Sequence, residues 1–116
     1  MFDRPPYKDH PLWSEAMSLT REGYALADRV KEGDPALAMQ VKKAAVAVPA
    51  QVAGALAAEP GASERRDHLA EARGALASLV RHARSCGLPG SDELARHAEL
   101  FDRSVLFELG AGEKLF

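Results

Sequence analysis

Six basic side chains in this sequence have the type and spacing needed to meet a phosphate-bearing partner. They are Lys42, Lys43, Arg66, Arg73, Arg81 and Arg84. Basic residues along one face of a helix neutralise nucleic-acid phosphates and release their counterions. These six residues are therefore the candidate nucleic-acid-binding residues of the chain.

A second interpretation is that the arginines stabilise the fold. Residues 64–86 carry five arginines against three acidic residues, whereas residues 91–109 carry two arginines against five acidic residues. If these segments are antiparallel neighbours, their charges largely neutralise each other. Arginines beside a core face also cover apolar surface or pair with carboxylates on another helix. The sequence alone leaves both interpretations open.

Residues that could hold a metal or act as a nucleophile are not arranged for it. Glu64, His68 and Glu71 share helical spacing, but carboxylate metal sites in bundle cores use a Glu-x-x-His motif on each of two helices. Here His68 precedes Glu71, which is the reverse order. Cys86 lies near a helix C-terminus, where a thiolate is not stabilised. Neither a glycine-rich phosphate loop nor a nucleophile–base arrangement is visible, so we expect no metal, no cofactor and no enzymatic activity.

Composition sets wider bounds on the class of protein. A chain of 116 residues fits one domain with a real core, and its 47% hydrophobic content excludes disorder. The formal net charge of −2 shows no bias toward polyanions. A single cysteine suits a reducing compartment, and the near-apolar run over residues 44–58 is shorter than the ~20 residues that span a bilayer. We therefore expect a cytoplasmic protein without a membrane partner.

Proline, glycine and capping residues divide the chain into four helical segments. We expect helices at about residues 11–31, 35–58, 64–86 and 92–109, within a bundle spanning residues 9–110. Residues 1–8 would form an extended arm and residues 111–116 a tail. Asp34, Ser63 and Ser91 have the types that cap helix N-termini, and Gly87 suits a left-handed helix end. The short connections predict an all-α, up-down-up-down bundle.

Apolar residues recur every three or four positions in three of these segments and predict the core. In the first and third segments they are Leu12, Ala16, Leu19, Leu26, Val30, Leu69, Ala72, Leu76, Leu79, Val80 and Ala83. In the fourth segment they are Leu94, Ala98, Phe101, Val105 and Leu109.

The second segment differs because it contains a proline and is apolar on nearly every side. Pro49 removes one backbone hydrogen bond, at a cost of roughly 3 kcal/mol in a helix interior. No turn-forming residues accompany it, so the pattern favours a kinked helix over a break. The segment is also apolar on the sides that would not face the core, whereas each helix of a lone bundle exposes a polar face to water. One interpretation is that alanine tolerates exposure. The other is a second copy of the chain, whose interface residues would be Val46, Ala47, Ala50, Ala53, Gly54 and Ala57.

The order of residues resembles the four-helix-bundle protein family of 23S rRNA intervening-sequence proteins and diversity-generating retroelement accessory proteins. The matches to its three motifs are Leu12 and Trp13; Lys42, Lys43, Ala44, Ala45, Val48, Pro49, Val52 and Ala53; and Ala72, Gly74, Leu76, Ala77 and Leu79. The resemblance covers residues 9–109, and the proline motif is its most specific part. Ala50, Gln51, Gly54 and Ala55 depart from the serine, asparagine, glutamate and glycine usual in that motif.

The resemblance implies a bent second helix and a ring-shaped homopentamer. It also implies two functional hypotheses. The first is a non-catalytic, self-assembling scaffold or interaction platform. The second is a nucleic-acid-binding or ribonucleoprotein accessory protein, as the retroelement members are.

Overall fold

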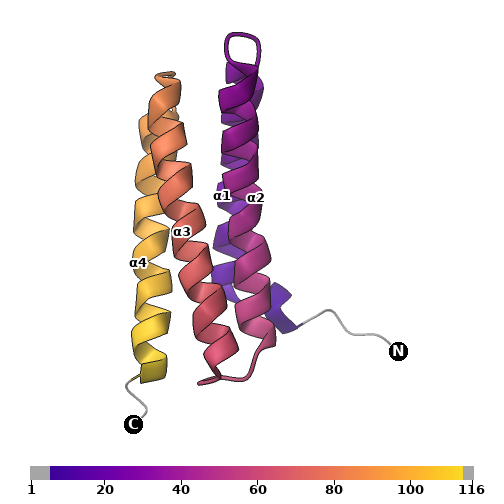
Figure 1. Cartoon of the computed structure of the whole chain (residues 1–116), viewed down its shortest axis with the longest axis vertical. Coiled ribbons are helices and arrows are strands. Elements are labelled where there is room, and N and C mark those ends of the chain that lie inside the picture. Colours follow the sequence, from indigo (N-terminus) through magenta and orange to yellow (C-terminus); the bar gives the residue numbers. More distant parts are fainter. Residues whose placement is uncertain (1–5, 114–116) are drawn as a thin grey trace, which may run out of the picture.

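The computed structural model describes residues 6–113, which form four α-helices after one short 3-10 helix, η1, at Pro6–Asp9. The α-helices are α1 (Pro11–Val30), α2 (Pro35–Ala57), α3 (Ser63–Cys86) and α4 (Ser91–Glu113). No strand occurs within these residues, which confirms the prediction of an all-α fold with four packed helices. The helices run alternately up and down, with α1 beside α2 and α3 beside α4 (Figure 1).

Local chemistry explains where two of the helices begin. The N–H of Leu12 donates to Nδ1 of His10, and Pro11 occupies the first turn, where its missing N–H leaves no hydrogen bond unmade. The N–H of Leu37 donates to Oδ1 of Asp34 at 3.0 Å, which confirms Asp34 as a cap.

The two serines expected as caps act differently. Ser63 is the first residue of α3 itself, and Ala62 precedes it with no side-chain cap. The Ser91 hydroxyl accepts from the N–H of Leu88, so it closes the turn before α4. Gly87, with a φ of 62°, ends α3 in the left-handed conformation as predicted.

The outer segments also differ from the expectation. The expected arm over residues 1–8 includes the start of η1, because the backbone turns where the N–H of His10 donates to the Tyr7 carbonyl. Residues 1–5 lie outside the described residues. Helix α4 continues to Glu113 rather than ending at residue 109. Gly110 has no positive φ, since glycine permits a left-handed stop without requiring one.

The core contains nearly all the residues that the periodicity selects. Leu19, Leu79, Val52 and Val105 are fully buried, one from each helix. Val80 and Leu109, two of the expected core residues, are only half-buried at its edge. Helix α2 packs closely on both α1 and α3, while α1 and α4 meet over a smaller area and α2 does not contact α4.

Helix α2 is continuous through Pro49, which is buried, and its neighbour α1 explains how. Proline has no N–H to donate to the carbonyl of Ala45, four residues earlier. The hydroxyl of Thr20 on α1 lies 3.0 Å from that oxygen and 2.9 Å from the carbonyl of Ala16. Gly23 allows this approach, because a Cβ there would lie 2.7 Å from the Cβ of Ala45. The single hydroxyl proton is shared between these two carbonyls, so a polar contact with α1 partly replaces the bond that the proline removes.

Candidate interaction surfaces

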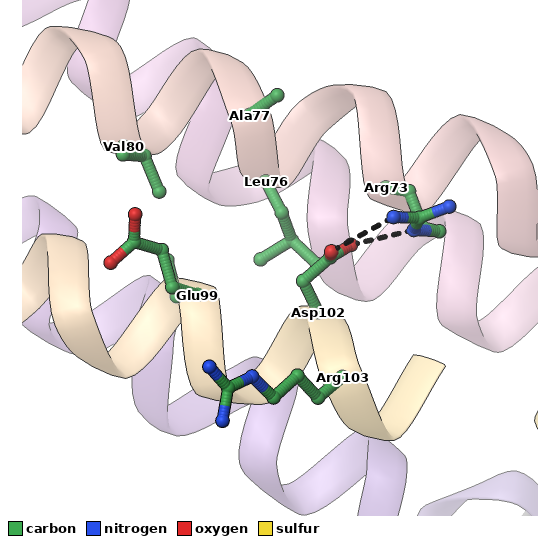
Figure 2. A pocket seen from close by; sticks show the side chains of 8 residues that line it. Arg73, Leu76, Ala77, Val80, Glu99, Asp102 and Arg103 are labelled. Atoms are coloured by element: carbon green, nitrogen blue, oxygen red, sulfur yellow. Dashed lines mark hydrogen bonds and ion pairs between the residues drawn. The ribbon is translucent and has the colours of Figure 1, made fainter. Parts of the chain in front are cut away.

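The α3–α4 face contains a hollow of about 540 Å³ between Arg73, Val80, Glu99 and Arg103. Figure 2 shows an ion pair across it, where Arg73 on α3 meets Asp102 on α4. Nε and Nη2 of Arg73 donate to the two carboxylate oxygens at 2.9 and 3.1 Å. These hydrogen bonds raise the pKa of Arg73 above its ordinary value, against a smaller opposing effect of burial. The hollow is therefore crossed by a neutralised pair.

A second arginine of the candidate set is paired across the same two helices. Arg84 donates from both terminal nitrogens to the carboxylate of Glu99, at 3.0 and 3.1 Å. Two-pronged pairs of this kind hold the guanidinium plane against the carboxylate. Arg73 and Arg84 thus pair with carboxylates of α4, as the stabilising interpretation expects, whereas Arg66 and Arg81 form no ion pair with another described residue.

The remaining basic candidates separate onto different faces. Lys42 reaches toward α1, with Nζ 3.6 Å from Asp28 and 5.4 Å from the ring centre of Tyr24. Arg66 is exposed on α3. Lys43 and Arg81 together line a hollow of about 300 Å³ between α2 and α3. The structure therefore brings two of the six candidate residues together and distributes the others.

An exposed apolar stripe runs along the outside of α2. We define the α2 outer stripe as Met39, Val46, Ala50, Ala53 and Ala57. Met39 is 69% exposed and Val46 is 48% exposed. Ala50 and Ala57 are exposed as well, and Ala53 is half-buried. Beside Met39 and Val46 lies a groove of about 470 Å³. Its other lining residues include Tyr24 of α1 and the side chains of Lys31, Lys42 and Lys43.

Two residues of the expected interface lie beside α3 within the chain. Ala47 lines the hollow between α2 and α3. Gly54 lies under the ring of His68, because a Cβ there would be 2.8 Å from the ring atoms. Nδ1 of His68 is also 2.8 Å from Oε1 of Gln51, which fixes the ring over α2. Gly54 therefore also serves a contact within the chain, and its place in an interface between copies stays a prediction.

A second apolar surface, on α4, was missed by the sequence reasoning. The exposed side chains are Leu100, Leu106 and Phe107, with Phe107 73% exposed and Leu100 54% exposed. Leu100 and Phe107 lie two turns apart on one side of α4, and we call these two residues the α4 outer patch; Leu106 is turned about 100° from Phe107 around the helix. Its signal was available, because Leu100 and Phe107 are seven residues apart and lie off the core stripe. The α4 outer patch is at the opposite corner of the bundle from α2, which α4 does not touch.

His68 and Cys86, which were considered for metal or thiol chemistry, have hydrogen-bond partners within the chain. Within residues 6–113, no group of three His, Cys, Asp or Glu side chains is placed to hold a metal ion. Burial raises the pKa of the Cys86 thiol, and nearby Asp34 adds to the effect while Arg29 opposes it. The thiol also donates to the carbonyl of His82 at 3.3 Å. Cys86 therefore favours its uncharged form.

Two further observations concern the chain as a whole. Between residues 6 and 113, no helix combines the length and the apolar character needed to cross a membrane. No family model, curated protein or solved structure matches the chain.

Proposed function

We propose that the chain is a non-catalytic, self-associating four-helix-bundle protein that serves as a scaffold or interaction platform. The observation that carries the proposal is the pair of exposed apolar surfaces, the α2 outer stripe and the α4 outer patch. Met39 and Val46 share one side of α2, and Leu100 and Phe107 share one side of α4; exposed apolar side chains grouped in this way suit a contact with another copy. Burying them against another copy removes apolar surface from water, at about 25 cal/mol per Å².

The position of the two surfaces supports a ring. They belong to helices that do not contact each other, so one copy presents two different surfaces at opposite corners. If the α2 outer stripe of one copy packs against the α4 outer patch of the next, the contact is head-to-tail, and such contacts form rings when the rotation closes. A homopentamer, and membership of the four-helix-bundle family, follow from the motif resemblance around Pro49 and belong to the same proposal.

The test is a pair of charge substitutions read by light scattering and native mass spectrometry. We expect the wild-type chain to exceed its monomer mass of 12.5 kDa several-fold. Val46→Glu and Phe107→Glu should each give monomers, because each places a carboxylate in an apolar contact. An equimolar mixture of the two variants should give dimers, since one intact α2 outer stripe and one intact α4 outer patch remain.

The matched control is Ala70→Glu, which adds the same charge at an exposed position of α3. It should leave the assembly mass unchanged. Monomers in the variant mixture would contradict the head-to-tail arrangement. A wild-type chain of monomer mass at micromolar concentration would contradict self-association itself.

The nucleic-acid alternative has weaker support. On α3, Arg73 pairs with Asp102 and Arg84 pairs with Glu99. On α2, Lys42 pairs with Asp28. A cation that is already paired gains less from a phosphate. Gel retardation of RNA or DNA that weakens steeply with salt would favour this alternative, and unaltered migration at low ionic strength would count against it.

A further inference from the structure

Two of the unpaired basic side chains converge on the hollow between α2 and α3. The lining residues are Gln40, Lys43, Ala44, Ala47, Ala75, Ser78, Arg81 and His82. Every polar residue among them can donate a hydrogen bond, and none is acidic. In a chain of net charge −2, this is a local concentration of donors and positive charge.

The helices explain why these cations remain unpaired. Successive side chains on a helix diverge by about 100°, so Lys42 reaches Asp28 on α1, whereas Lys43 lies between the groove beside Met39 and the hollow beside α3 and lines both. On α3, Arg84 points to Glu99 of α4. Arg81, three residues earlier, donates a 3.4 Å hydrogen bond to the Ser78 hydroxyl, and no carboxylate within residues 6–113 forms an ion pair with it.

The depth of the hollow comes from alanine. Ala44 is buried in its lining and Ala47 and Ala75 are half-buried, so we call these three residues the alanine floor; their short side chains leave about 300 Å³ between the helices. That volume is at the lower end of the range for small-molecule sites. An apolar floor with donors around it suits a ligand that has one anionic group on a small body.

We propose that this hollow, which we call the α2–α3 anion site, binds the phosphate group of a small phosphate monoester. The Arg81 guanidinium and the Lys43 ammonium would supply the charge, and Gln40, Ser78 and His82 would donate further hydrogen bonds to the phosphate oxygens. The small organic part would lie on the alanine floor. The site lies within one copy of the chain, and of its two cations Lys43 also lines the groove beside the α2 outer stripe whereas Arg81 does not, so Arg81 tests the site apart from self-association.

The test is calorimetric titration of the full chain at constant ionic strength, with inorganic phosphate and phenyl phosphate as separate probes. Both probes should bind, and a titration with chloride serves as the reference for non-specific anion binding. Tighter binding of phenyl phosphate would show that an ester occupies the site, as proposed. Equal binding of the two probes would contradict the role of the alanine floor, and absence of binding by either would overturn the site.

The decisive variants remove one charge each from α3. Arg81→Gln should weaken binding about tenfold or more, because a charge-assisted hydrogen bond to phosphate is lost. Arg66→Gln, an exposed control on the same helix, should leave the dissociation constant within about twofold. Both should keep the wild-type thermal midpoint without phosphate.

A competition experiment with RNA distinguishes a site for a small phosphate ester from a basic surface that binds any polyanion. A single-stranded RNA oligonucleotide should not compete with phenyl phosphate at low concentration. If the RNA does compete with phenyl phosphate, and Arg66→Gln and Arg81→Gln weaken this competition equally, the two ligands bind a diffuse basic surface. That result would overturn the proposal.

Discussion

Gly23 of α1 and Ala45 of α2 leave no room for another carbon atom between the two helices. Both residues are buried, and a Cβ on Gly23 would lie 2.7 Å from that of Ala45. That neighbour is a methyl group attached directly to the backbone, so it cannot rotate away. Gly74 on α3 is the opposite case, because nothing lies within 4 Å of where its Cβ would be.

These surroundings predict opposite effects of the same substitution. Gly23→Ala should lower the free energy of unfolding by about 1–2 kcal/mol, because overpacking exceeds the gain in helix propensity. Gly74→Ala should raise it by about 0.5–1 kcal/mol, because only the propensity changes. Urea denaturation followed by circular dichroism measures both. Equal effects of the two substitutions would mean that α1 and α2 are not in close contact at Gly23.

At the scale of one element, α2 shows how a helix keeps a proline in its interior. The helix needs a donor for the carbonyl of Ala45, and the Thr20 hydroxyl of α1 lies within hydrogen-bond distance. A buried carbonyl without a donor costs about 1–3 kcal/mol. The continuity of α2 at Pro49 therefore depends on a side chain that is 25 residues away from Ala45 in sequence.

A double-mutant cycle tests this dependence. Thr20→Val should lower the free energy of unfolding by about 1–2 kcal/mol in the wild type, since the carbonyl of Ala45 loses its donor. In a Pro49→Ala background the loss should be about 1 kcal/mol smaller, because the new N–H at position 49 reaches the same carbonyl. Chemical denaturation of the four proteins gives the coupling. Strictly additive effects would show that Thr20 does not replace the missing bond.

The elements were predictable from the sequence to the extent that their signals are local. Four helices and most of the core follow from three- and four-residue spacing, as the buried Leu19, Leu79 and Val105 show. The role of Ser91 could not be predicted, because its hydroxyl bonds backward to Leu88 rather than into α4. Nor could the hydroxyl donor beside Pro49, since nothing in the spacing within α2 points to a residue on α1.

The candidate site was less predictable, since it depends on which helices become neighbours. Charge totals indicated that α3 and α4 would neutralise each other, and the pair between Arg73 and Asp102 has that form. Only the packed structure shows that Arg84 faces α4 while Arg81 faces α2. Apolar residues on every side of α2 indicated an exposed surface, but only the packed structure shows that the ring of His68 lies over Gly54.

At the scale of the whole molecule, the bundle closes where α1 meets α4 over a small area. His97 of α4 lies between two carboxylates of α1, with Nδ1 2.7 Å from Glu22 and Nε2 3.2 Å from Glu15. Phe101, one turn further along α4, is buried in the core. The closure thus combines a partly exposed polar contact with a buried apolar one.

These two contacts should contribute unequally to stability. His97→Ala should lower the free energy of unfolding by less than about 1 kcal/mol, because partly exposed polar contacts contribute little in water. Phe101→Ala should lower it by about 3–5 kcal/mol, because it removes buried surface and leaves a cavity. Guanidinium denaturation compares the two, with Glu22→Gln as a control that keeps the shape of the His97 contact. If His97→Ala were as destabilising as Phe101→Ala, the polar contact and not the core would hold α4 against α1.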